Sequence, residues 1–236
     1  MKGVLLAGGT GSRLWPLTKV TNKHLLPVGR EPMIFHPLKK MIGAGVSEVL
    51  LVTGTEHMGD VIGLLGSGRD LGCDLTYRVQ DRAGGIAEAL GLARRFAGDD
   101  RICVILGDNV FADDLGPFVE RYLQSGQGAR VLLKEIEDPK RFGVAELKGD
   151  KIVRIVEKPD NPPSSLAVTG IYFYDSSVFD LIAELRPSKR DELEITDVNN
   201  GYIAKSQLGW DLLPGWWTDA GTFDSLQRAN QLLMDR

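Results

Sequence analysis

A glycine-rich turn follows the first apolar run of the chain, and two cations follow the turn. The segment reads Leu6-Ala-Gly-Gly-Thr-Gly-Ser-Arg13, and Lys23 lies ten residues beyond Arg13. Glycines after a buried strand let backbone N–H groups approach an anion, and Arg and Lys side chains can neutralise a triphosphate. The segment lacks both the GxGxxG fingerprint of dinucleotide folds and the Gly-Lys-Ser/Thr of a Walker A loop. We therefore predict an anion site of another kind at this turn.

The charge of the chain is distributed unevenly. Residues 1–40 hold seven Lys or Arg and the single acid Glu31, a net charge of +6. The whole chain of 236 residues has a net charge of −4, so the remaining residues carry −10. A basic segment on an acidic protein indicates a local anion site, and the overall acidity argues against a general nucleic-acid binder.

Short apolar runs alternate with helical patterns along the first half of the chain, which predicts βαβ units. The second half has a more mixed pattern. The expected fold class is α/β: a single-domain, Rossmann-like, mixed and mostly parallel sheet with helices on both faces, spanning residues 1–236. Strands are expected at Lys2–Ala7, Glu48–Thr53, Leu75–Val79, Arg101–Leu106, 129–136, 142–147, 151–157 and Ala167–Tyr174, and helices near 32–44, 57–66, 84–96, Glu194–Lys205 and from Thr222 onward.

Several classes of protein are disfavoured by composition. The apolar stretch before Gly8 is too short for a signal peptide, and no run approaches the roughly 20 apolar residues of a membrane span. The two cysteines, Cys73 and Cys103, form neither a disulfide framework nor a CxxC metal motif. We expect a soluble, cytoplasmic protein that contacts neither membranes nor nucleic acid.

The order of short motifs along the chain resembles that of the sugar-1-phosphate nucleotidyltransferases. Any single motif is weak, but their shared order covers essentially the whole chain and is hard to reach by chance. The nearest branch is the one that joins thymidylate to glucose 1-phosphate. The motifs are Leu6–Leu14, Pro16–Thr18, Lys23–Val28, Val79–Gln80, Gly84–Leu90, Leu106–Asn109, Phe142–Val144, Glu157–Pro159, Val168–Asp175, Glu192–Asn199 and Trp217–Thr222.

The resemblance implies a reaction between dTTP and glucose 1-phosphate that gives dTDP-glucose and pyrophosphate with the help of Mg²⁺. A phosphate oxygen of the sugar would attack the α-phosphorus in line. Positioning and charge neutralisation would then carry most of the catalysis, and no general base is needed because the attacking oxygen is already ionised. Transfer from UTP to the same sugar, and guanylyl transfer to mannose 1-phosphate, remain open on the same fold. A non-catalytic, sugar-nucleotide-binding regulatory homologue is the alternative from another class, but it would be expected to have lost one of Arg13, Lys23, Asp108 or Asp219.

The resemblance also implies a role for each matching residue. Gln80 could pair with thymine or uracil through its acceptor and its donor together, which does not separate dTTP from UTP. Two aspartates from distant segments suffice for Mg²⁺, which takes phosphate and water oxygens as its other ligands. The implied roles are catalysis for Arg13, Lys23 and Lys158; nucleotide binding for Leu6, Gly8, Gly9, Gly11, Gln80, Gly85 and Asp108; sugar binding for Asn109, Gly143, Glu157, Val168, Thr169 and Trp217; and metal binding for Asp108 and Asp219.

Simpler interpretations stand beside several of these roles. Asp108 could cap a helix, Asp219 could serve a turn, and Trp217 could belong to the core. Strand alternation would put Glu157 and Lys158 on opposite faces. His24, at a position where longer relatives have glutamine, is expected to form a polar wall, and Glu194–Asn199 is expected to be structural or interfacial. We also expect this short form to lack the feedback helices of longer relatives. Whether the protein forms a homo-oligomer is left open.

Overall fold

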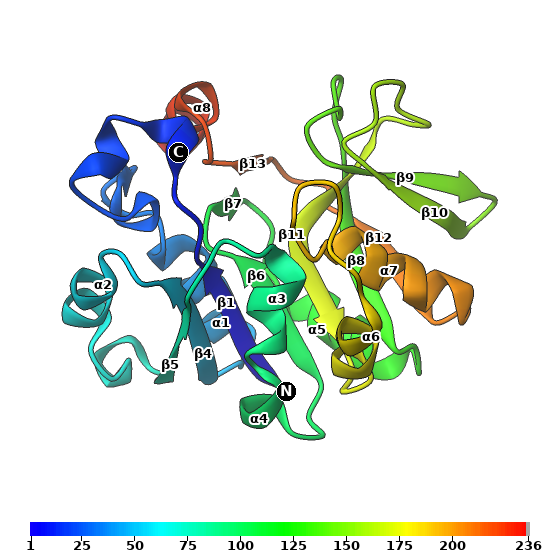
Figure 1. The fold of residues 1–236 in the computed structure, drawn as a ribbon, viewed down its shortest axis with the longest axis horizontal. Coiled ribbons are helices and arrows are strands. Elements are labelled where there is room, and N and C mark those ends of the chain that lie inside the picture. Colours follow the sequence, from blue (N-terminus) through cyan, green and yellow to red (C-terminus); the bar gives the residue numbers. More distant parts are fainter. Residues whose placement is uncertain (235–236) are drawn as a thin grey trace.

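Four parallel strands form the half of the sheet that carries the glycine-rich turn. The computed structural model describes residues 1–234. In it, β1 (Lys2–Ala7) lies between β4 (Glu48–Gly54) and β6 (Ile102–Leu106), and β5 (Asp74–Gln80) pairs with β4. Because all three pairs are parallel, the carboxyl ends of these strands meet at one edge of the sheet (Figure 1).

The other half of the sheet is built around β11 (Leu166–Tyr174). This strand runs antiparallel to β6, to β8 (Ala129–Glu135) and to β9 (Gly143–Lys148). β9 forms a hairpin with β10 (Lys151–Glu157), and β12 (Leu208–Leu212) runs parallel to β8. The result is one mixed sheet of nine strands, which confirms the expected fold class.

Side chains that alternate along β1 enter two separate cores on the two faces of the sheet. Leu5 belongs to one core and Val4 to the other. Helices therefore cover both faces, as predicted (Figure 1). The core of Leu5 includes α1 (Phe35–Gly43), α2 (Met58–Leu65) and α5 (Gly116–Gln124), and the core of Val4 includes α3 (Ile86–Gly91), α4 (Arg94–Ala97), α6 (Val178–Glu184) and α7 (Ile195–Ala204).

A third, smaller core holds the segment that carries Arg13 and Lys23. Leu14 and Met33 from this segment pack with Ala229 of α8 (Phe223–Met234). Figure 1 shows the segment, in blue, beside α8. The short elements are the 3₁₀ turns η1 (Ser12–Leu14), η2 (Leu17–Lys19), η3 (Lys23–Leu25) and η4 (Arg69–Leu71), the strand pair β2 (Pro27–Val28) with β3 (Glu31–Pro32), and the strand pair β7 (Asn109–Phe111) with β13 (Trp217–Asp219).

The structure differs from the sequence prediction in a few elements. The helix expected near 84–96 is divided, because α3 ends at Gly91 and α4 starts at Arg94; glycine is a weak helix former. The elements α5, α6, β7, β12 and β13 were not expected from the sequence. Among residues 1–234, no helix combines the length and the apolar character that crossing a membrane requires.

Candidate active site

A two-stranded ribbon brings Asp108 and Asp219 together. β7 pairs antiparallel with β13, so that Asn109 lies opposite Asp219, and the N–H of Ala220 donates to the carbonyl of Asp108 at 2.7 Å. Both side chains point toward Gly221. A Cβ placed on Gly221 would lie 3.4 Å from Oδ2 of Asp108 and 3.3 Å from Oδ2 of Asp219. Two carboxylates from distant parts of the chain therefore face one position.

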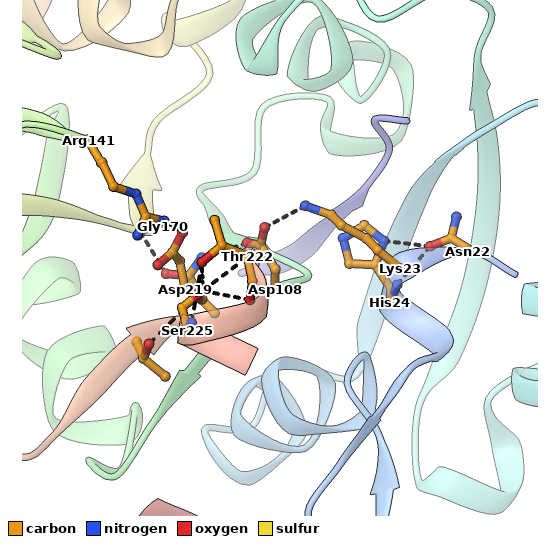
Figure 2. A network of polar contacts seen from close by, with 11 residues as sticks. Asn22, Lys23, His24, Asp108, Arg141, Gly170, Asp219, Thr222 and Ser225 are labelled. Atoms are coloured by element: carbon orange, nitrogen blue, oxygen red, sulfur yellow. Dashed lines mark hydrogen bonds and ion pairs between the residues drawn. The ribbon is translucent and has the colours of Figure 1, made fainter. Parts of the chain in front are cut away.

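Each of the two carboxylates has a cationic partner. Nζ of Lys23 lies 2.5 Å from Oδ2 of Asp108, and Nη2 of Arg141 lies 2.9 Å from Oδ2 of Asp219 (Figure 2). The guanidinium of Arg13 reaches the same place, because its Nη2 would lie 3.1 Å from the Cβ position of Gly221. The site thus combines two acids with three cations.

The two carboxyl groups have different pKa values, although both are buried. Burial raises the pKa of Asp219 to about 6, and Asp108 adds to the rise, while Arg141 and Arg13 oppose it. Burial also favours a higher pKa for Asp108, but Lys23 outweighs it and holds that pKa well below its usual range. The two acids repel one another, and a cation between them would relieve that repulsion.

The two carboxylates at this position suit a magnesium ion, and they are too few for a metal that is held by protein ligands alone. Residues 1–234 contain no group of three or more His, Cys, Asp or Glu side chains arranged to hold a metal. Magnesium is commonly held by one or two carboxylates and completes its shell with phosphate and water oxygens. Gly221 keeps the position between the carboxylates open, since a side chain there would fill it.

A first cavity opens beside the carboxylates, at the end of β10. Glu157 is the last residue of β10, and Lys158 follows it with a φ of 41°. This left-handed conformation breaks the alternation of the strand. Both side chains therefore line the same cavity, and Nζ of Lys158 lies 3.4 Å from Oε1 of Glu157. Other expected residues on its wall are Asn109, Gly143, Val168 and Trp217.

Asn109 ties the wall of the first cavity to the carboxylate site. Its Nδ2 donates to Oδ1 of Asp108 at 3.0 Å, and its Oδ1 accepts the N–H of Gly170 at 2.9 Å and Nε1 of Trp217 at 2.7 Å. A Cβ on Gly170 would lie only 2.5 Å from Nδ2 of Asn109, so a glycine is needed there. Asn109 thereby orients both Asp108 and Trp217, and Trp217 combines a core position with a place on the wall.

A second cavity lies on the other side of Asp108, against the glycine-rich turn. It shares Arg13 and Asp108 with the first cavity, so the two cavities meet at these residues. Gly85 on its wall has a φ of 99°, and a Cβ there would overlap with the carbonyl oxygen of Leu193. The other expected residues on this wall are Leu6, Gly8, Gly9, Lys23 and Gln80.

Gln80 turns one end of its amide toward the second cavity. Its Nε2 donates to the carbonyl of Gly85 at 3.2 Å and to Oε1 of Glu88 at 3.0 Å. No donor among residues 1–234 bonds its Oε1, which would lie 3.0 Å from a Cβ on Gly8. The amide therefore offers an acceptor alone, whereas both its donor and its acceptor were expected to be available.

His24 forms a neutral wall of the second cavity. Its Nδ1 lies 2.8 Å from Oδ1 of Asn22, and only 1% of the residue is exposed (Figure 2). Burial, helped by the charge of Lys23, lowers the pKa of His24 to about 3. A Cβ on Gly107 would lie 2.7 Å from its Cδ2. This packed environment agrees with the expected polar wall rather than with a catalytic base.

Comparison with known families shows to which family the chain belongs. The family model described as Nucleotidyl transferase matches residues 2–236. The chain belongs to the nucleotidyl transferase family. This result confirms the resemblance that the order of motifs indicated, and it makes the chain a transferase.

Individual relatives of this nucleotidyl transferase cover its length. It is 40% identical over 233 residues to the glucose-1-phosphate thymidylyltransferase of Neisseria meningitidis, with 97% of this chain and 81% of that sequence covered. It is 39% identical over 241 residues to the low-salt glycan biosynthesis nucleotidyltransferase Agl11 of Haloferax volcanii, with 100% of this chain but only 66% of that sequence covered. A crystal structure of a candidate glucose-1-phosphate thymidylyltransferase from Bacillus anthracis, in complex with a sucrose, matches with a TM-score of 0.96 and 59% identity, covering 100% of this chain and 96% of that chain.

The two cavities of this nucleotidyl transferase hold most of the residues expected to form a site, but not Thr169 or Gly11. Thr169 is fully buried and its hydroxyl donates to the carbonyl of Leu132 at 2.8 Å. The expectation that this hydroxyl contacts the sugar in the first cavity was therefore wrong. Gly11 has a φ of 61°, and its carbonyl accepts the hydroxyl of Thr18 at 2.9 Å. Gly11 therefore shapes the turn and does not line either cavity.

Two arginines that were not expected from the sequence line the first cavity of the nucleotidyl transferase. Arg141, the partner of Asp219, precedes the Phe142–Val144 motif directly, so its position was a signal that could have been used. Nη2 of Arg190 lies 3.2 Å from Oε1 of Glu157. Both arginines line the first cavity.

The start of α7 also belongs to the first cavity, contrary to the structural or interfacial role expected for it. Oγ1 of Thr196 donates to Oε2 of Glu157 at 2.6 Å. Glu194 and Asn199 line the same cavity, and Glu194 holds Nη2 of Arg190 at 2.8 Å. The Glu192–Asn199 motif could be recognised in the sequence, but its contacts depend on residues that are distant along the chain.

Proposed function

We propose that this nucleotidyl transferase moves a thymidylyl group from dTTP to glucose 1-phosphate, giving dTDP-glucose and pyrophosphate. The observation that carries the proposal is the meeting of two cavities at Asp108 and Arg13, with Asp219 facing the same position. Relatives named glucose-1-phosphate thymidylyltransferase, at 40% and 42% identity, support this pair of substrates. Residues 1–236 act as one catalytic unit in this proposal.

The nucleotide occupies the second cavity. Leu6 and Gly85 flank the base, and Oε1 of Gln80 accepts its N3–H. Thymine and uracil share this N3–H, so Gln80 supports either pyrimidine. The triphosphate runs past the glycine-rich turn toward Arg13 and Lys23, whose charges neutralise it.

The sugar 1-phosphate occupies the first cavity. Lys158 and Arg190 supply positive charge for its phosphate, and Glu157 accepts from its hydroxyl groups. Asn109, Trp217, Gly143 and Val168 complete the wall of this cavity. The sugar phosphate is thereby brought to the α-phosphate at the point where the cavities meet.

The transfer depends on position and charge. The attacking phosphate oxygen is ionised at neutral pH, which agrees with a neutral, buried His24 and with the absence of any need for a general base. Arg13 and Lys23 hold the phosphates of the nucleotide against their mutual repulsion while the bond to pyrophosphate breaks. Asp108 and Asp219 would hold Mg²⁺, which when bound supplies further neutralisation of phosphate charge.

The test is pyrophosphate release from each of dTTP, UTP, GTP, CTP and ATP with glucose 1-phosphate, with Mg²⁺ and with EDTA. We expect turnover with dTTP that EDTA abolishes. A clear preference for GTP, or no turnover with any nucleotide, would contradict the proposal. Equal or higher kcat/KM with UTP would instead assign uridylyl transfer.

A further inference from the structure

The carboxylate of Glu88 contacts the Nε2 end of the Gln80 amide, and Glu88 is not among the residues that line the second cavity. Glu88 belongs to the first turn of α3, and its Oε1 accepts Nε2 of Gln80 at 3.0 Å. The carbonyl of Gly85 accepts the same Nε2 at 3.2 Å. Both hydrogens of the Gln80 amide are therefore used, and only 7% of the residue is exposed.

The Glu88 carboxylate is itself held in place from two sides. Nη2 of Arg82 donates to its Oε2 at 2.8 Å. The carboxylate also lies against the backbone of Gly84, where a Cβ would overlap with both of its oxygens. Gly84 has no left-handed φ, so the space that it leaves, rather than its backbone conformation, is what accommodates Glu88.

These contacts allow one orientation of the Gln80 amide. If the amide turned over, Oε1 would face the carboxylate of Glu88 and the carbonyl of Gly85, which are both acceptors. That arrangement loses two hydrogen bonds and places like charges together. The cavity is therefore presented with an acceptor and not with a donor.

We propose that Glu88 determines base selectivity by fixing the Gln80 amide with its oxygen toward the base. This inference rests on the proposed function, because it takes the second cavity as the nucleotide site. Thymine and uracil carry an N3–H that the oxygen accepts, whereas cytosine carries an unprotonated N3 that the oxygen repels. Glu88 is a positioning residue that acts through Gln80 and selects pyrimidines with N3–H over cytosine.

The test compares dTTP with dCTP in the wild type and in Glu88→Met, which keeps the length of the side chain but removes its acceptor. Calorimetry gives the Kd of each nucleotide with Mg²⁺ present, and pyrophosphate release with glucose 1-phosphate gives kcat/KM. We expect the wild type to prefer dTTP and E88M to lose about tenfold to hundredfold of that preference, the value of a hydrogen bond to a charged group. A general structural defect would weaken the binding of both nucleotides and leave the ratio of their Kd values unchanged.

Two further variants sharpen the result. Gly84→Ala must displace the Glu88 carboxylate without touching the second cavity, so it should reduce the same ratio and it decides the question if E88M does not fold. Arg82→Met removes one of the two contacts that hold the Glu88 carboxylate but leaves the bond to Gln80, so we expect its ratio to fall by less than that of E88M.

The outcomes separate this inference from the proposed function. A wild type that binds dTTP and dCTP equally, or an unchanged ratio in both E88M and G84A, would overturn the role of Glu88. Preferential binding of dTTP that E88M abolishes, in a protein that releases no pyrophosphate, would support the role of Glu88 and contradict the proposed thymidylyl transfer.

Discussion

Lys23 and Asp108 form an ion pair of 2.5 Å at the point where the two cavities meet. The pair joins η3 to the loop after β6, across 85 residues of the chain. Only 13% of the Lys23 side chain and 11% of the Asp108 side chain are exposed. A nucleotide phosphate competes for Lys23 and a divalent cation competes for Asp108, so ligand binding must draw on both members of the pair.

Asp108→Asn should remove most of the turnover while the fold stays intact. The change keeps the shape of the side chain but removes one of the two carboxylate charges that would hold Mg²⁺. We expect kcat to fall by about 10²-fold or more, the scale of losing a preorganised electrostatic contact. The measurement is pyrophosphate release over a range of Mg²⁺ concentrations, with the exposed Asp114→Asn as the matched control. Full activity in D108N would exclude Asp108 as a metal ligand.

Lys158→Met should weaken the binding of the sugar phosphate and leave the binding of the nucleotide unchanged. Lys158 lines the first cavity and not the second, so removal of its charge leaves the glycine-rich turn untouched. We expect KM for glucose 1-phosphate to rise about tenfold or more, because a charge-assisted contact is lost, with KM for dTTP within about threefold. Lys151→Met at the other end of β10 is the control. An equal rise in both KM values would show that Lys158 does not act on the sugar phosphate.

Local features of the sequence predicted the parts of the site that lie at strand ends. The glycine-rich turn, Gln80 and Asp108 each follow or end a parallel strand, and such ends share one edge of a sheet. This rule needs only the apolar runs and their order. It explains why the second cavity could be anticipated from the sequence.

Contacts that depend on backbone irregularity could not be predicted in the same way. Strand alternation separates Glu157 from Lys158, and only the left-handed φ of Lys158 puts both in one cavity. The register of β11 shifts between Val168 and Tyr172, so a periodicity of two residues does not fix which way Thr169 points. The pairing of Arg190 with Glu157 depends on a loop that no local pattern places.

Thr169→Val should reduce stability and leave the kinetics unchanged. The hydroxyl of Thr169 is fully buried and bonds the Leu132 carbonyl, away from both cavities. Loss of a buried hydrogen bond costs about 1–3 kcal/mol, and each kcal/mol lowers Tm by roughly 2–4 °C in a chain of this size. Thermal denaturation measures the shift, and KM for glucose 1-phosphate is expected to stay at the wild-type value. A raised KM with an unchanged Tm would restore the sugar contact that was inferred from the sequence.

Gly221→Ala should impair turnover by filling the position on which the carboxylates converge. The added methyl group would lie 3.1 Å from Nη2 of Arg13 and 3.3 Å from Oδ2 of Asp219, so these two groups must give way by a few tenths of an ångström, and it would touch Oδ2 of Asp108 at 3.4 Å. Gly221 has no left-handed φ, and the fold should accept alanine.

The expected result for G221A is a loss of about tenfold to hundredfold in kcat, because small displacements of positioning groups are costly in transfers of this kind. The Mg²⁺ concentration for half-maximal rate should rise as well, since the carboxylate of Asp219 moves. Gly63→Ala in α2 is the matched control, because its methyl group would meet no atom within 4 Å. Wild-type turnover with an unchanged Mg²⁺ requirement in G221A would mean that the reacting groups do not occupy this position.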